Sequence, residues 1–209
     1  MTIKKMLQSF LIYIFFYAGI NIYIMNLKLS AIPFTIISII NMLIINGLLI
    51  KINNINIKER IKDFKKNKKD YLKLIFKTLL IGLIFIIITN SIISHFNELP
   101  QNELTLRKEI KLYPIYYILN ILILGPIMEE ILFRYTFTII KNKYIYLIVT
   151  TLFFAFLHMQ KIPEDLIYLI PYSLMSFTFT YPFYKTNNII NSIITHSAYN
   201  LISLILILF

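Results

Sequence analysis

Hydrophobic residues in this chain are gathered into long runs that alternate with short polar stretches. The runs lie near residues 7–25, 29–50, 74–93, 115–140, 145–160, 165–183 and 188–209. A helix that crosses a bilayer needs about 20 apolar residues, with about 17 as the practical minimum. The run at 145–160 is the shortest, and a residue or two more brings it to that minimum. The pattern predicts an all-α fold, a polytopic transmembrane helical bundle of about seven spans.

The composition agrees with this prediction and excludes an ordinary soluble domain. Hydrophobic residues make up 58% of the chain and charged residues 15%, whereas a soluble domain carries about a quarter charged residues. The chain has no cysteine, which excludes a disulfide framework, a thiolate nucleophile and a thiolate metal site. The first apolar run is too long for a secretory signal and no small-x-small cleavage site follows it, so we predict a retained first helix.

Charge along the chain predicts the side of the membrane on which each loop lies. The segment from about 51 to 77 is rich in lysine, and such segments stay in the cytoplasm. Alternation from there predicts an N-in, C-out topology, with the 94–113 loop outside. Within the basic segment Ile57, Ile61 and Phe64 recur at helical spacing, which suits either a topology signal alone or an amphipathic helix on anionic lipid. Nucleic-acid binding is not predicted, because this segment carries most of the net charge of +11 and topology already explains it.

Few charged residues or histidines lie away from the ends of the apolar runs. They are Glu129, Glu130 and Arg134 in the fourth run, His158 in the fifth and His196 in the seventh. A charge at the centre of a membrane helix costs about 2.5–3.5 kcal/mol and is kept mostly for function. Glu130 and Arg134 are four apart, on one helical face and in pairing reach. Their pairing would leave Glu129 as a desolvated carboxyl group suited to act as a general base.

Two further pairs repeat this spacing. Phe154 and His158 are four apart in the fifth run, and His196 and Asn200 are four apart in the seventh. At about 1.5 Å per residue from the cytoplasmic helix ends, Glu129 and these three polar groups lie about 12–20 Å into the bilayer. The spacing therefore predicts that four polar groups from three helices converge near the bilayer centre.

The fourth run is interrupted by a proline. Pro126 lacks the N–H that would bond to the carbonyl oxygen of Leu122. The two glutamates follow three and four residues later. We therefore expect the helix to bend or open just before them.

Three interpretations of these residues remain open at this point. Glu130 and Arg134 could form a purely structural ion pair, with the histidines hydrogen-bonded inside the bundle. The charges could line the pathway of a proton- or ion-coupled transporter, although such proteins favour inverted repeats with broken helices in both halves. They could also form a catalytic site, and if that site is not used the protein would be a non-catalytic membrane scaffold or immunity protein.

The three motifs together resemble those of one protein family. They read Glu129-Glu130-x-x-x-Arg134, Phe154-x-x-x-His158 and His196-x-x-x-Asn200. In this order and on separate helices they resemble the CAAX protease and bacteriocin-processing family, also called the type II CAAX prenyl endopeptidase or Abi family. The resemblance covers about residues 110–206. It implies a catalytic core at 111–209 and a variable N-terminal transmembrane part at 1–110.

The resemblance implies hydrolysis of a peptide bond within the membrane. Glu129, assisted by His158, would activate a water molecule. His196 and Asn200 would stabilise the oxyanion, and such electrostatic stabilisation usually contributes most to acyl-transfer catalysis.

Three residues would support the geometry of that site: Glu130, Arg134 and Phe154. No cofactor is firmly predicted, and zinc is the one candidate. A zinc site would use Glu129, His158 and His196, with an open fourth position. We prefer a metal-independent mechanism, because no His-Glu-x-x-His helix is present.

The expected partners are membrane lipid and a membrane-associated protein or peptide substrate. Prenylated proteins, bacteriocin leaders and signalling-peptide precursors are the candidate substrates, and the sequence indicates no oligomeric state. The expected location is a cell membrane, that of a bacterium given the abundance of Ile, Asn and Lys. Two departures from the family affect substrate fit: Tyr135 stands where glycine is usual, and Asn187-Asn188 replaces a common glycine-containing entry to the last helix.

Overall fold

The computed structural model describes residues 1–95 and 98–208, and among these residues it contains helices and no strand. The predicted all-α class is confirmed. Phe209, the last residue of the seventh run, and residues 96–97 of the predicted outer loop lie outside the described part of the chain.

The helices follow the predicted runs in order. The first part of the chain forms α1 (Ile3–Ile12), η1 (Tyr13–Ile20), α2 (Asn21–Asn26), α3 (Ala31–Ile52), α4 (Ile57–Lys66), α5 (Lys68–Ile93) and α6 (Gln101–Leu112). The fourth run forms α7 (Pro114–Leu119), η2 (Asn120–Leu124), α8 (Gly125–Glu130), η3 (Ile131–Tyr135) and η4 (Thr136–Ile139). The last part forms α9 (Lys143–Leu157), η5 (Glu164–Tyr168), α10 (Leu169–Thr186) and α11 (Ile189–Leu208).

Within the described residues, five segments are long and apolar enough to cross a membrane. They are Ile3–Asn26, Ala31–Ile52, Lys68–Ile93, Pro114–Ile139 and Ile189–Ile207. Helix α9 is apolar but has only 15 residues. Helix α10 has 18 residues, but its serine, threonine, tyrosine and proline positions make it less apolar. A multi-pass helical bundle is therefore supported, whereas the count of seven spans and the N-in, C-out orientation stay predictions.

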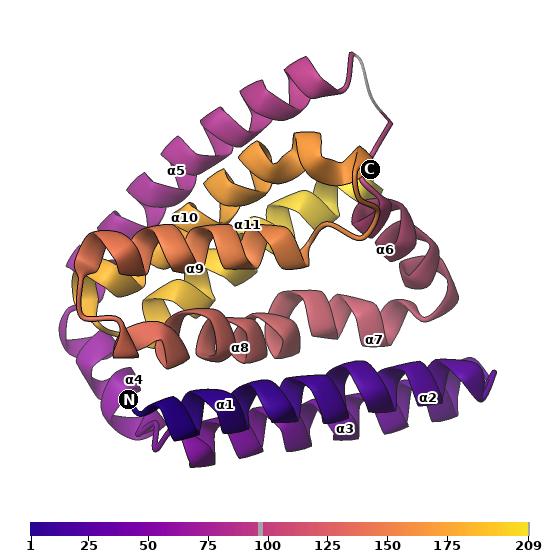
Figure 1. The fold of residues 1–209 in the computed structure, drawn as a ribbon, viewed down its shortest axis with the longest axis horizontal. Coiled ribbons are helices and arrows are strands. Elements are labelled where there is room, and N and C mark those ends of the chain that lie inside the picture. Colours follow the sequence, from indigo (N-terminus) through magenta and orange to yellow (C-terminus); the bar gives the residue numbers. More distant parts are fainter. Residues whose placement is uncertain (96–97, 209) are drawn as a thin grey trace.

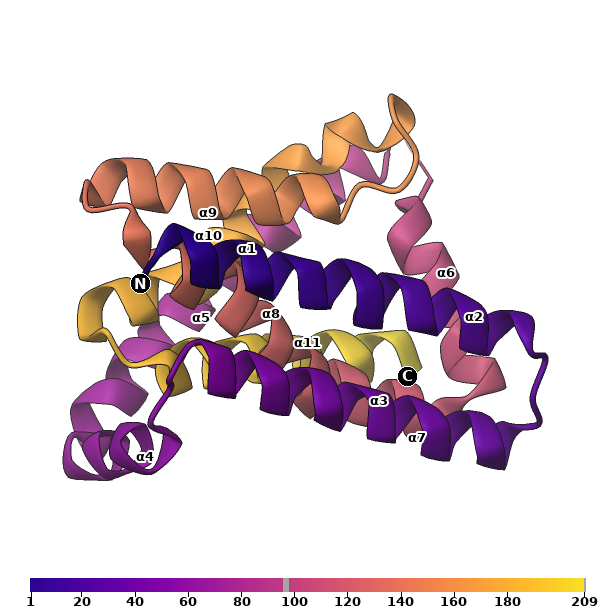
Figure 2. The same ribbon diagram turned by 60° about the horizontal axis from the view of Figure 1, so that its bottom comes forward.

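The helices are arranged around one shared core. The α1–α2 rod and α3 run side by side, α4 lies at one end of the bundle, and α6 lies at the opposite end (Figures 1 and 2). Met42 and Ile45 of α3 are fully buried in one hydrophobic cluster with Met128 and Ile131 of the fourth run. The expected N-terminal part (1–110) and catalytic core (111–209) thus bury apolar surface against each other, and the two parts remain a prediction as separate units.

The fourth run is one continuous rod whose winding widens twice. Its backbone widens to a π-helix at η2, directly before Gly125 and Pro126, and again at η3, directly after Glu130. The Gly125 N–H bonds to the carbonyl of Asn120, five residues back, and a Cβ on Gly125 would lie 2.9 Å from that oxygen. The helix therefore opens before the two glutamates, as the proline predicts, and glycine is needed for the close approach. Single π turns of this kind are frequent at functional sites.

Candidate active site

A buried ion pair lies at the centre of the candidate site. The Nε atom of Arg134 lies 3.2 Å from Oε2 of Glu130, and neither side chain is exposed. The two residues are four apart across the junction of α8 and η3, which places them on one face of the rod. The predicted pair is therefore present. A single charge at this position would be strongly unfavourable, and its partner makes burial tolerable.

Helix α10 completes the surroundings of the arginine. Arg134 donates from Nε to Oγ1 of Thr180 at 3.2 Å and from Nη2 to Oγ of Ser176 at 3.1 Å. Its guanidinium carbon lies 4.4 Å from the centre of the Phe154 ring, a cation–π contact. Among the described residues, Nη1 has no hydrogen-bond partner. The arginine is thus held by two helices besides its own.

Helix α11 binds the carboxylate of the pair. The hydroxyl of Ser192 donates a short hydrogen bond to Oε2 of Glu130, and Nδ1 of His196 lies 2.7 Å from Oε1. An ionised carboxylate can only accept, so the His196 proton is on Nδ1. The other ring nitrogen, Nε2, takes no part in the hydrogen bond to Glu130. It lies 3.9 Å from Oε2 of Glu129.

Glu129 differs from its neighbour in having no arginine or lysine in contact among the described residues. Its side chain is 21% exposed, and its buried Oε2 atom has no hydrogen-bond partner in the described part of the chain. The carboxylate interacts electrostatically with Tyr13 and Tyr17 of η1, whose rings stack 5.2 Å apart. Burying an acceptor atom without a hydrogen-bond donor costs free energy, and such atoms are often found at functional sites.

His158 joins the cluster through an aromatic ring. It ends α9, and its Nδ1 lies 2.8 Å from the carbonyl oxygen of Phe154. The imidazole stacks on the Phe154 ring with centroids 4.1 Å apart, and the same ring meets His196 edge-on at 6.1 Å. Phe154 is fully buried and therefore fixes the spacing of the two histidines.

Asn200 lies one turn beyond His196 and makes a different contact. Its Nδ2 donates to the carbonyl oxygen of Ile121 at 2.8 Å. In a π turn the N–H at position 126 would bond to this carbonyl, five residues back, and Pro126 has no N–H to offer. The side chain of Asn46 similarly donates to the carbonyl of Leu124 at 3.0 Å. Asn200 thus reaches the candidate site from the widened part of the rod, with one of its two N–H groups engaged.

The residues do not form a group suited to a metal ion as they are arranged here. Among residues 1–95 and 98–208, no three His, Asp or Glu side chains come together as ligands. Glu129 and His196 approach each other to 3.9 Å, whereas His158 contacts the cluster through its stacking on Phe154. The candidate zinc set of Glu129, His158 and His196 is therefore not assembled among these described residues, and zinc stays a prediction.

Several residues that build the site escape the motif analysis. Ser192 precedes His196 by four residues, and Ser176 and Thr180 are four apart on α10, so each extends a polar stripe. That spacing is a usable signal, because residues four apart share a helical face. Tyr13 carries no such signal, since nothing local indicates that the first helix meets the fourth run.

The part of the chain that builds this site matches a known family. Residues 111–202 match the family model described as Type II CAAX prenyl endopeptidase Rce1-like. This segment contains all three motifs, and the match confirms the family resemblance drawn from them. It leaves the roles of the individual residues to be tested.

Two curated proteins are similar to the chain. The UPF0177 protein YxdF of Lactococcus lactis subsp. lactis (strain IL1403) is 41% identical over 86 residues, which are 41% of this chain and 45% of that protein. A protein of Mycoplasma capricolum subsp. capricolum named "Uncharacterized protein" is 29% identical over 184 residues, 82% of this chain and 54% of that protein. The chain thus spans about half the length of the curated relatives it matches. No solved structure matches it.

Proposed function

We propose that this chain is an intramembrane endopeptidase whose base is Glu129. The proposal is supported by the match of residues 111–202 to the Rce1-like family of type II CAAX prenyl endopeptidases, a protease family. The substrate would be a membrane-associated protein or peptide precursor, processed in CAAX-type, bacteriocin or signal-peptide maturation or in immunity. The proposed location is the bacterial plasma membrane.

One observation carries the assignment of Glu129. Its Oε2 is buried without a donor and lies 3.9 Å from Nε2 of His196, which accepts rather than donates when the proton is on Nδ1. This separation is too long for a direct hydrogen bond. It suits a water molecule that donates one proton to each atom. Glu130 cannot replace Glu129 in this role, because Arg134, Ser192 and His196 already occupy its oxygens.

Hydrolysis would then proceed in two proton transfers. Glu129 removes a proton as the water oxygen bonds to the carbonyl carbon of the scissile peptide, and the carbonyl oxygen takes the electron pair. When this oxyanion collapses, the C–N bond breaks and the proton on Glu129 moves to the leaving nitrogen. The products are a carboxyl group and an amine, and the carboxylate of Glu129 is regenerated.

The other residues would position these steps. His158, held by its stacking on Phe154, would assist Glu129. The second N–H of Asn200 would donate to the oxyanion. His196 would orient the attacking water, whose second proton its Nε2 accepts in a hydrogen bond. Glu130 and Arg134 would keep α8, α10 and α11 in register without touching the substrate.

Glu129→Gln tests this proposal, because it keeps the size of the side chain and removes the base. Membranes from cells that express wild type or Glu129→Gln are compared by mass spectrometry of protein and peptide termini. We expect new termini with wild type only, at equal levels of the two proteins on immunoblots. Identical termini in both samples would favour the non-catalytic scaffold.

Chelation separates the metal-independent mechanism from a metalloprotease. Purified protein that produces the Glu129-dependent cleavage is treated with a strong chelator and assayed again. We expect activity to survive. Loss on chelation and recovery on adding zinc would contradict metal independence and leave the peptidase assignment intact.

A further inference from the structure

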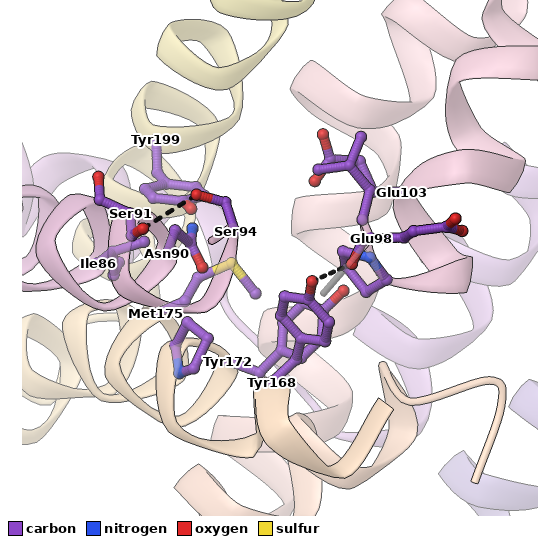
Figure 3. A pocket seen from close by; sticks show the side chains of 13 residues that line it. Ile86, Asn90, Ser91, Ser94, Glu98, Glu103, Tyr168, Tyr172, Met175 and Tyr199 are labelled. Carbon is purple, nitrogen blue, oxygen red and sulfur yellow. Dashed lines mark hydrogen bonds between the residues drawn. The ribbon is translucent and has the colours of Figure 1, made fainter. Parts of the chain in front are cut away.

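A cavity of about 560 Å³ opens beside the candidate active site. Its walls come from α5, the segment 98–103, α10 and α11 (Figure 3). Asn90 and Ser94 of α5 lie on one side, and Glu103 faces them from the start of α6, with Tyr168 and Tyr172 between (Figure 3). The volume is within the range of about 300–1,000 Å³ that is usual for ligand sites.

The inner wall of the cavity touches the catalytic cluster. Tyr172 lines the cavity, and its ring centre lies 5.5 Å from that of His158. Tyr199 also lines it and lies 5.4 Å from Phe179, the ring that stacks on His196 at 4.1 Å. One layer of aromatic rings therefore separates the cavity from both histidines.

The chemistry of the walls indicates what the cavity can hold. Hydroxyl groups, a carboxamide and two glutamates, Glu98 and Glu103, alternate with aromatic rings, so that a polypeptide backbone would find both donors and acceptors. Glu103 is paired with Arg107 at 2.6 Å, which compensates the charge of that glutamate. An apolar prenyl chain would have to desolvate these polar groups without replacing their hydrogen bonds.

A second hollow shows the contrast. It lies between α9 and α10 and measures about 390 Å³. Its lining is largely apolar, with Leu152, Leu169, Ile170 and Phe177 among its residues. Such a surface suits a lipid chain, and the first cavity does not resemble it.

The position of the cavity in the bundle indicates from which side of the membrane a substrate would enter it. It lies at the α5–α6 end of the bundle, opposite the basic helix α4 (Figures 1 and 2). The positive-inside rule places α4 in the cytoplasm and hence the cavity at the outer face. We propose that this cavity binds an unlipidated polypeptide segment of the substrate from the outer face of the membrane and holds it one layer of aromatic rings away from the two histidines. This inference rests on the proposed function and names the substrate class of the same site.

Because the chain has no cysteine, single cysteines introduced into the cavity can be modified selectively. Cysteine is introduced at Asn90 or at Ser94, and at Ile92 as a control on the same helix that is 60% exposed and outside the lining. Intact cells are treated with 2-sulfonatoethyl methanethiosulfonate, which does not cross membranes. The readout is the Glu129-dependent cleavage, measured for each variant before and after treatment. We expect a loss of about tenfold or more for Asn90→Cys and Ser94→Cys, and no change for Ile92→Cys.

The outcomes separate this inference from the proposed function. Cleavage that persists after complete modification of both cavity cysteines would overturn the inference and leave the peptidase standing. Inhibition only in inside-out vesicles would overturn it as well, because the cavity would then open to the cytoplasm. If Ser94→Cys at normal protein level loses cleavage before treatment, that loss supports the cavity directly. Equal termini in wild type and Glu129→Gln would defeat the proposed function itself.

Discussion

Two carboxylates in this molecule are bound by neighbouring turns of the same helix, and they are held in different ways. In the surface cluster, Asp63 of α4 accepts from Nδ2 of Asn188 at 2.7 Å and from the hydroxyl of Tyr71 at 2.9 Å. In the buried cluster, Glu130 accepts from Ser192 and His196 and faces Arg134. Asn188, Ser192 and His196 follow one another at intervals of four residues. One face of α11, with Asn188 at its start, thus binds both a carboxylate at the solvent-accessible end of the bundle and a carboxylate in its buried centre.

The difference lies in whether a countercharge is required. Asp63 is partly exposed, and neutral donors are its main partners; the Asn188 hydrogen bond is the chief cause that lowers the pKa of its carboxyl group. Glu130 is fully buried and has a guanidinium group in contact. Solvent stabilises the negative charge of the partly exposed Asp63, whereas Arg134 must stabilise the negative charge of the buried Glu130. The comparison teaches that the burial of a carboxylate determines whether its partner must be charged. Burial also determines how much stability is lost when that partner is removed.

Removing Arg134 should break the buried cluster and give the largest effect. Arg134→Met leaves the Glu130 carboxylate unpaired in a dry site, so we expect a loss of about 3–5 kcal/mol in stability. Thermal unfolding in detergent and immunoblots of membranes measure it. The matched control is the double variant Glu130→Leu/Arg134→Met, which removes both charges and should recover most of the stability. Equal instability of the two variants would contradict a charge effect.

A smaller effect is expected when one neutral donor is removed from the buried cluster. Ser192→Ala leaves Oε2 of Glu130 with Arg134 alone, and a lost buried hydrogen bond of this kind costs about 1–3 kcal/mol. Ser197→Ala, on the same helix, serves as the control. Unfolding temperatures of the two variants give the answer, and a Ser192→Ala protein as stable as Ser197→Ala would remove Ser192 from the cluster's support.

The surface cluster should give the smallest effect and a pH dependence. A carboxyl whose pKa is lowered on folding adds stability above its unfolded pKa of about 3.8 and loses it as the pH falls through the folded value. Asp63→Asn should therefore cost no more than about 1 kcal/mol at pH 7. The difference from wild type should vanish at a pH below the folded pKa. Unfolding curves at neutral and acidic pH measure it, and a difference that grows on acidification would reverse the assigned sign.

Some of this architecture is readable from the sequence because it depends on local spacing. The Glu130–Arg134 pair is set by a four-residue interval on one rod, and the opening of that rod follows from Pro126. The substitution Asn187-Asn188 also has a local reason. Asn187 ends α10 in the left-handed region, with φ 51° and ψ 23°, and asparagine is among the few residues besides glycine that adopt it readily.

Other features depend on which helices meet, and no spacing reveals that. The sequence predicts a freed carbonyl near Pro126 but not that Asn200 fills it. The contact of Tyr13 with Phe133, at 6.3 Å between ring centres, joins the first helix to the fourth run across more than half the chain. The apolar run of α10 predicts a span, yet its Ser176 and Thr180 point to Arg134 and make the helix less apolar than the long candidate span α5.

Gly82 on α5 lies at a close contact with α10. A methyl group there would lie 2.1 Å from Oγ1 of Thr178 on α10, and only 3.0 Å from its Cβ, so the backbones themselves would have to separate. One turn further along the same face lies Ile86, then Asn90 and Ser94, which line the cavity of about 560 Å³. Because Gly82 has no side chain, α5 can pack close to α10, and this packing sets the distance between the cavity wall on α5 and the histidines. The largest polypeptide segment that can enter is decided at a residue that never touches it.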